Sequence, residues 1–325
     1  CLYQGYPDLY MQTSKVNDWH YCPDWYRGMD YPKERERGYN ATEDLLVPGY
    51  FEMPIKKGES IVFSAGIAPI EAKEINALME KEISQIDHRD SFYHCLVNAA
   101  HQFRVNKDNE SYILAGYPWF KPRARDTFIS LPGLTLAIGE KERFEEYMAT
   151  AAKGIQNFIN KEPMSVDIYE MEQPDTLLWA TWTIQQYAKY TSRKVCYEKY
   201  GKLFKDIMDY IWNGGHPNLF IHDNRLLYAN GRDKAITWMN SQSGGRPIVP
   251  RSGYIVEFNA LWYNALKFFE QLIDENGSEE YQGLKTEVAK TAEKVAQSFK
   301  EVFLNEYGYL LDYVDGQMMD WSVRP

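Results

Sequence analysis

Apolar residues recur at three- and four-residue steps along most of the chain after residue 69, which is the spacing of one face of an α-helix. The clearest stripes of this kind cover residues 144–158, 200–211, 258–272 and 284–299. Pro174 is placed to start a further helix through Trp182, while Gly277 and Ser278 mark an end and a cap between two helices. We therefore predict a series of helices that pack through these apolar faces.

Residues 1–68 have a different texture, rich in Tyr, Pro and Gly with short extended runs such as residues 60–64. We interpret them as the trailing part of a β domain with its linker, and residues 69–325 as a second, helical domain. Residues 218–230 interrupt the helical rhythm and predict a small β-hairpin. Because strands do not alternate with helices, a parallel α/β sheet is excluded, and stacked helix pairs closed or partly closed into a toroid are favoured.

The net charge of -10 comes from 46 acidic and 36 basic residues, and no Lys/Arg cluster interleaves with aromatic residues. Nucleic acid and anionic membranes are therefore not expected as partners. The four cysteines, Cys1, Cys22, Cys95 and Cys196, are too widely spaced for a zinc or disulfide framework. They indicate reduced thiols and a cytoplasmic protein. The alternative is an exported protein with a disulfide between Cys1 and Cys22.

Several enzyme classes are excluded by motifs that the sequence lacks, namely GxxxxGK[ST], GxGxxG, HExxH and GxSxG. The six histidines include no pair at metal-ligand spacing beside a suitable carboxylate, so no metal site is expected.

Three segments combine Trp, Arg and carboxylates just before a predicted helix: residues 116–134, 173–179 and 237–266, here the first, second and third motifs. In the first motif, Arg125 beside Asp126 pairs a donor fork with an acceptor, which suits two neighbouring sugar hydroxyls. Trp119 is available to cover the apolar face of the ring. The simpler alternatives are a capping Asp126 beside a surface arginine, and a Glu257 that only complements a helix dipole.

The order and spacing of these motifs resemble the glycogen debranching enzyme family, relatives of the glucoamylase-like toroids. The first motif reads GYPWFKPRARDT and then LPGL, the second reads QPDTLLW, and the third reads TWMN, PR and VEFNALWYNAL. Glu34, Arg37-Gly38, Glu43-Asp44-Leu45 and Pro48-Gly49 look like the family's segment between its β domain and its toroid. The similarity covers residues from about 25 to 325.

The resemblance implies a mainly α, (α/α)6 toroid and a glycoside hydrolase that releases α-1,6-linked glucose from branch stubs with inversion. It implies an α-glucan or branched maltooligosaccharide as substrate, and neither a metal nor an organic cofactor. Arg125 and Asp126 would grip the terminal glucose, and three tryptophans would line its pocket, Trp119, Trp179 and Trp238. The residues that would orient or contact the substrate are Asp175, Arg251, Asn259 and Trp262.

The sequence departs from the family at the expected catalytic acid, where Asn240 replaces the Asp of TWMD. An amide cannot donate a proton to a glycosidic oxygen at neutral pH. Either Glu257, the nearest matching acid, takes over in a catalytic centre that includes Asn240, or the protein binds glucan on the same scaffold without cleaving it. Arg123-Ala124 also replaces a Trp-Gly pair, which removes one ring from the pocket.

The family continues beyond Pro325 through helices that should supply the catalytic base, so we expect the toroid to be incomplete within this sequence. A helical scaffold for protein partners is a further alternative, but it would leave the three motifs unexplained.

Overall fold

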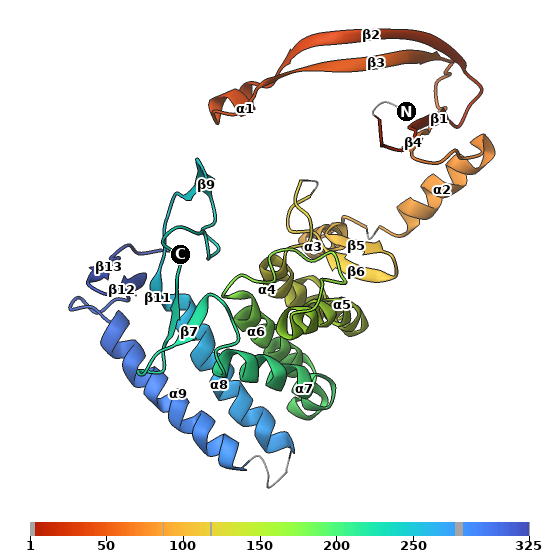
Figure 1. Ribbon diagram of the computed structural model, residues 1–325. Coiled ribbons are helices and arrows are strands. Elements are labelled where there is room, and N and C mark those ends of the chain that lie inside the picture. The colour runs from red at the N-terminus through yellow and green to blue at the C-terminus, as the bar shows by residue number, and fades with distance from the viewer. Residues whose placement is uncertain (1–3, 87, 118, 277–281, 325) are drawn as a thin grey trace. The chain divides into compact units, whose positions relative to one another are not determined.

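The computed structural model describes residues 4–324 except 87, 118 and 277–281, and it forms two compact units, residues 1–94 and 95–325 (Figure 1). The change from strands to helices falls between Gly66 and Ala72, beside the predicted domain boundary, whereas the compact units divide between His94 and Cys95.

Unit 1 consists mainly of two antiparallel strand pairs, β1 with β4 and β2 with β3, followed by a helix. Every residue of β2 is exposed, and only Thr13 and Ile75 are buried among the described residues of this unit. The predicted β-rich character of the N-terminal part is thus confirmed. The elements are β1 (Tyr10–Thr13), β2 (Asp18–Asp30), α1 (Pro32–Glu36), β3 (Thr42–Glu52), β4 (Phe63–Gly66) and α2 (Ala72–Ser84).

Unit 2 is predominantly helical, as predicted. The stripes at residues 144–158, 200–211, 258–272 and 284–299 lie in α5, α7, α8 and α9, and Pro174 precedes α6 by two residues. The predicted boundary at Gly277 and Ser278 lies outside the described residues. The helices are α3 (Phe92–Gln102), α4 (Ala124–Leu134), a 3-10 turn (Leu136–Ile138), α5 (Lys141–Asn160), α6 (Thr176–Tyr190), α7 (Arg193–Trp212), α8 (Val256–Asn276) and α9 (Gln282–Phe303).

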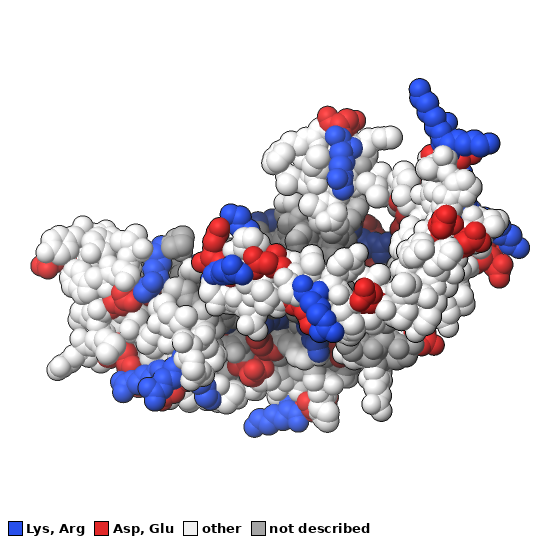
Figure 2. All heavy atoms as spheres, turned by 90° about the horizontal axis from the view of Figure 1, so that it is seen from above, with Lys and Arg blue, Asp and Glu red and all other residues white. Residues whose placement is uncertain are grey.

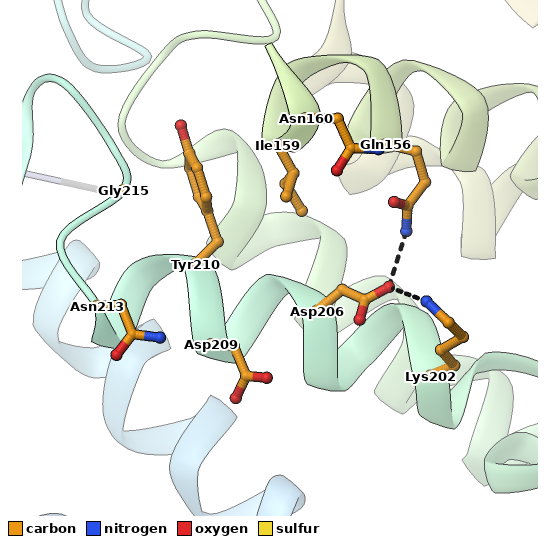
Figure 3. Close-up of a pocket in the computed structure, with 9 residues that line it drawn as sticks. All are labelled: Gln156, Ile159, Asn160, Lys202, Asp206, Asp209, Tyr210, Asn213 and Gly215. Carbon is orange, nitrogen blue, oxygen red and sulfur yellow. Dashed lines mark hydrogen bonds and ion pairs between the residues drawn. The ribbon is translucent and has the colours of Figure 1, made fainter. Parts of the chain in front are cut away.

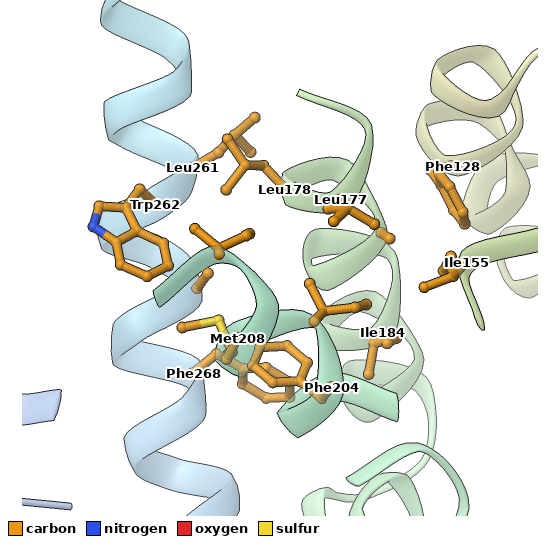
Figure 4. Close-up of a cluster of buried hydrophobic side chains, with 14 of the residues drawn as sticks. Phe128, Ile155, Leu177, Leu178, Ile184, Phe204, Met208, Leu261, Trp262 and Phe268 are labelled. Atoms are coloured by element: carbon orange, nitrogen blue, oxygen red, sulfur yellow. The ribbon is translucent and has the colours of Figure 1, made fainter. Parts of the chain in front are cut away.

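The core of unit 2 forms where α4, α6, α7 and α8 pack together (Figure 4). Phe128, Leu178, Phe204 and Trp262 come from these four helices in turn and are fully or almost fully buried. Each such side chain contributes about 1.5–3 kcal/mol through removal of apolar surface from water. This packing fixes the N-terminal ends of α4, α6 and α8, and each of those ends carries one of the three motifs.

A small antiparallel sheet in the order β13-β12-β11-β8-β7 joins segments that are far apart in the sequence. The predicted hairpin is confirmed by β7 and β8, with Leu219 opposite Ala229. The other strands of unit 2, including the β5–β6 hairpin, were not predicted, because most are too short to show alternation. The strands are β5 (Arg104–Lys107), β6 (Glu110–Ile113), β7 (Leu219–Ile221), β8 (Leu227–Ala229), β9 (Gln242–Ser243), β10 (Arg246–Pro247), β11 (Gly253–Ile255), β12 (Tyr313–Asp315) and β13 (Met318–Met319).

Lys and Arg side chains lie scattered among acidic and uncharged ones on the face that Figure 2 shows. None of the helices in the described ranges is long and apolar enough to cross a membrane. Cys22, Cys95 and Cys196 are free thiols, and Cys1 lies outside the described residues.

Candidate functional site

Arg125, in the first turn of α4, connects all three motifs through one buried side chain. Its Nε and Nη2 donate to the two carboxylate oxygens of Asp175, immediately before α6, at 2.7 and 2.8 Å. Nη2 also donates to the carbonyl oxygen of Ile236 at 3.4 Å, next to Thr237-Trp238 of the third motif. The motifs therefore meet at one end of the packed helices, as their positions before helices led us to expect.

The Arg125–Asp175 pair is almost completely withdrawn from solvent, with side-chain exposures of 7% and 2%. Burial lowers the pKa of the guanidinium, but the charge and hydrogen bonds of Asp175 more than offset this, so the pKa of Arg125 lies above its usual value. Removing one partner of such a pair typically costs about 3–5 kcal/mol of stability. These hydrogen bonds tie the first motif to the other two, so both residues position the motifs. Their predicted roles in gripping or orienting a sugar stay predictions.

Asp126 follows Arg125 but has a different environment. Its side chain is half-buried, and within the part of the chain that the structure describes its carboxylate has no hydrogen-bond or ion-pair partner. An ionised carboxylate offers about four acceptor positions. Asp126 is thus a carboxylate of the first motif that is available to bind a polyhydroxylated ligand.

A cavity of about 450 Å³ opens where the third motif meets the segment after α9. Its wall carries two aromatic rings, two arginines and two carboxylates: Trp238, Tyr309, Arg251, Arg324, Glu257 and Asp312. The Trp238 ring is half-exposed at 48%. Apolar ring faces beside convergent charged donors and acceptors are the combination that binds a sugar, whose ring has apolar faces and polar edges.

Arg251 organises the charges of this cavity. Its Nε and Nη2 donate to Asp312 at 2.9 and 2.7 Å, and its Nη1 and Nη2 donate to the two oxygens of Glu257, with Nη2–Oε2 at 2.7 Å. Arg324 Nε adds a bond to Asp312 at 2.9 Å. Burial lowers the pKa of Arg251, and Glu257 and Asp312 together raise it above its usual value, so the guanidinium stays charged.

Glu257 is the more accessible of the two carboxylates in this cavity. Its side chain is 25% exposed, against 4% for Asp312. Both of its oxygens accept hydrogen bonds from Arg251, an arrangement that uses the carboxylate as an acceptor.

Two residues predicted to contact substrate belong to the frame instead. Asn259 is fully buried in α8 and bonds the backbone N–H and C=O of Leu227 at 2.7 and 3.0 Å, so it ties the helix to β8. Trp262 is also fully buried, and its Nε1 donates to the Arg225 carbonyl at 3.3 Å. Neither side chain has surface to offer a ligand, and we leave both out of the site.

The remaining predicted residues lie outside the cavity wall. Trp119 is 82% exposed on the loop before α4, and Trp179 is partly buried with its ring edge-on to Trp182 at 5.6 Å. Asn240 is half-buried and is not among the described residues that line the cavity. Of the predicted residues, Trp238, Arg251 and Glu257 are thus the ones that share this wall.

Sequence reasoning missed the part of the wall that follows α9, namely Tyr309, Asp312 and Arg324. A signal for Asp312 was present, because it is a carboxylate inside the apolar run Leu310-Leu311-Asp312-Tyr313-Val314. A charged residue at such a position is rarely buried without a partner.

A second cavity of similar volume lies between the C-terminal parts of α5 and α7 (Figure 3). Two carboxylates line it. Asp206 accepts from Gln156 at 3.0 Å and from Lys202 at 2.7 Å, and Asp209 accepts from Lys205, so both are already satisfied internally. No group of His, Cys, Asp and Glu side chains that could hold a metal ion occurs among the described residues.

Family models match all of unit 2 and the first part of unit 1. A family model described as amylo-alpha-1,6-glucosidase matches residues 95–325, and one described as glycogen debranching enzyme N terminal matches residues 1–62. These matches confirm the resemblance carried by the three motifs. No curated protein matches the chain. A solved structure of a metal-independent alpha mannosidase from Streptococcus pneumoniae, in a non-productive complex with alpha-1,6-mannobiose, aligns at a TM-score of 0.44 and 14% identity, covering 76% of this chain and 68% of that one.

Proposed function

Since the chain belongs to the amylo-alpha-1,6-glucosidase family, and is thus a glycosidase-like enzyme, we propose that it hydrolyses α-1,6-linked glucose at the branch stubs of an α-glucan, with inversion. We place its helical unit in the (α/α)6 toroid class and take a branched maltooligosaccharide as the smallest full substrate.

The observation that carries this proposal is the meeting of the three motifs through Arg125, beside a cavity that combines aromatic rings with carboxylates. Trp238 would stack on the apolar face of the glucose ring, and Asp126 would accept hydrogen bonds from its hydroxyls. The Arg125–Asp175 pair would hold the segments that carry Trp238 and Asp126 in fixed positions relative to each other.

Inversion requires a protonated carboxyl at the leaving oxygen and a second carboxylate that activates water from the opposite face, about 6.5–9.5 Å away. We assign the acid to Glu257, because it is the more accessible carboxyl of the cavity and matches the family's motif. To donate a proton, Glu257 must give up at least one of its hydrogen bonds from Arg251. Arg251 can then remain paired with the buried Asp312, so the exchange leaves no arginine uncompensated.

The decisive experiment is incubation of the full-length protein with a phosphorylase limit dextrin, following the free glucose and its anomeric form by NMR. Release of glucose as the β-anomer supports inverting debranching. The α-anomer would mean that the configuration is retained and would contradict this mechanism.

The second candidate, a glucan-binding protein without turnover, is favoured by one observation, the amide of Asn240 in place of the family's acid. It predicts saturable binding of the same dextrin with no glucose released. An absence of both binding and release would refute both candidates.

A further inference from the structure

Three aromatic rings form a cluster at the edge of the cavity. Tyr307 and Trp321 lie with ring centroids 6.0 Å apart, Tyr309 and Trp321 are 6.4 Å apart, and the two tyrosines are stacked at 6.5 Å. Tyr309 also lines the cavity, so the cluster of Tyr307, Tyr309 and Trp321 begins at the wall of the proposed site. We call these three residues the aromatic cluster.

The rings are exposed although they touch one another. Tyr307 is 73% exposed, Trp321 41% and Tyr309 37%. Exposed apolar residues are ordinary when they are scattered, but contiguous ones indicate a binding surface. Tyr and Trp suit such a surface because their flat rings lose little conformational entropy when they bind.

Hydrogen bonds within the protein fix the two segments that carry the aromatic cluster. The side-chain Oδ1 of Asn305 accepts the backbone N–H groups of Tyr307 and Tyr309 at 3.0 and 3.2 Å, which closes the loop after α9. Next to Trp321, Asp320 donates its N–H to the Tyr313 carbonyl at 3.0 Å and accepts from the Ser322 N–H at 2.8 Å. Both segments that carry the rings are therefore pre-organised.

We propose that the aromatic cluster binds the glucan chain that bears the branch, by stacking on the glucose units next to the one in the cavity. This inference rests on the proposed function, because the cavity must hold the α-1,6-linked glucose for the chain to lie across the cluster. An α-glucan fits the surface chemically, since its rings present apolar C–H faces to the aromatic planes and hydroxyls to the phenol groups. The aromatic cluster thus selects for a branch on a longer chain over an isolated α-1,6-linked disaccharide.

The test compares two probes by calorimetry: isomaltose, which reaches only the cavity, and a glucosyl-branched maltooligosaccharide, which also reaches the aromatic cluster. We expect Tyr307→Ala and Trp321→Ala each to lower the affinity for the branched oligosaccharide by about 10-fold, as for aromatic hot spots elsewhere. The affinity for isomaltose should stay unchanged. Tyr307→Phe and Trp321→Phe keep a ring and should retain most of the affinity. Tyr190→Ala, which removes a 56% exposed ring at the end of α6, is the matched control and should change neither affinity.

Each other outcome contradicts the inference in a distinguishable way. Unchanged binding of the branched oligosaccharide by both alanine variants would refute the proposed role of the aromatic cluster and leave the proposed function intact. An equal loss for both probes would mean that the rings only support the cavity. Wild-type protein that binds neither probe would refute the proposed function itself. Thermal melts of all variants identify any loss that comes from misfolding.

Discussion

At the scale of single residues, Arg125 and Asp126 are neighbours in the sequence with opposite environments. Because the Asp126 carboxylate makes no hydrogen bond or ion pair in the described structure, Asp126→Ala should leave the melting temperature nearly unchanged. It should weaken binding of a branched maltooligosaccharide by about 1.5–3 kcal/mol, the value of a hydrogen bond to a charged group. Calorimetric titration and a thermal melt measure the two effects. Glu198→Ala, at an exposed carboxylate on α7, is the control, and equal affinities for both variants would contradict the role of Asp126.

The proton donor is tested by Glu257→Gln and Asn240→Asp, assayed by glucose release from a limit dextrin. Glutamine keeps the size of Glu257 and can still accept a hydrogen bond from Arg251, but it cannot donate an acidic proton. If Glu257 is the acid, its loss should lower turnover about 10²- to 10⁴-fold with little effect on substrate affinity. Full turnover by Glu257→Gln would contradict the assignment, and turnover that appears only in Asn240→Asp would identify the natural protein as a glucan binder.

His216 makes the stability of the protein depend on pH. Its imidazole is buried, its Nδ1 accepts the backbone N–H of Asn218 at 3.1 Å, and burial lowers its pKa to about 4. The unfolded chain binds this proton below about pH 6.5, whereas the folded chain does so only near pH 4. The stabilisation is therefore complete above about pH 6.5 and is lost as the pH falls, by roughly 3 kcal/mol in total.

Denaturant unfolding of the wild type and of His216→Asn at several pH values between 7 and 4.5 measures this contribution. The variant keeps an acceptor for Asn218 and loses the titrating group. Its stability should fall less steeply with pH than that of the wild type. Parallel pH curves would show that His216 does not contribute.

At the scale of elements, the loop between β8 and the third motif depends on Gly231. A Cβ at this position would lie 2.2 Å from the Arg251 carbonyl oxygen and 2.5 Å from Ile236 Cδ1. Gly231→Ala should therefore destabilise the fold by about 1–3 kcal/mol through overpacking. It should also weaken glucan binding, because the shifted atoms adjoin Trp238 and Arg251.

Gly133 in α4 is the matched control, since a Cβ there meets nothing within 4 Å. Gly133→Ala should raise the free energy of unfolding by up to about 1 kcal/mol through helix propensity, with unchanged affinity. Denaturant unfolding and calorimetry compare the two variants. A Gly231→Ala protein as stable as the wild type would contradict the close packing of this loop.

The sequence predicted the long helices well, because a stripe such as residues 258–272 repeats its signal over several turns. It predicted the β7–β8 hairpin from the break in the helical rhythm at residues 218–230. It could not predict β11, β12 and β13, whose two or three residues show no periodicity. The prediction of the site was therefore incomplete. Trp238, Arg251 and Glu257 were found through their motif, whereas Asp312 is brought to them by the pairing of β12 with β11.

Sequence patterns also failed to separate residues that touch a ligand from residues that hold the frame. Asn259 and Trp262 lie in the same motif and the same helix as Glu257, two and five residues after it. Which side of a helix meets the core depends on neighbours from elsewhere in the chain. Their backbone partners, Leu227 and Arg225, come from the β7–β8 hairpin. The residues of the third motif alone do not indicate these contacts.

At the scale of the whole molecule, the two units should differ sharply in local stability. All of β2 is exposed, whereas α6 buries most of its residues, and protection from amide exchange follows buried contacts. Hydrogen exchange followed by mass spectrometry should show fast exchange in β2 and β3 and slow exchange in α6. Equal protection would mean that the strands of unit 1 are covered by a surface that this structure does not contain.

The pairing of Arg251 with Asp312 has a consequence for how the protein is made. Asp312 follows Arg251 by 61 residues, so a ribosome adding about 5–20 residues per second reaches it about 3 to 12 s later. Glu257 follows Arg251 by only six residues and can pair with it in the meantime. The nascent chain therefore has a local counter-charge for Arg251 while α9 is being synthesised, and the cavity can close only after α9.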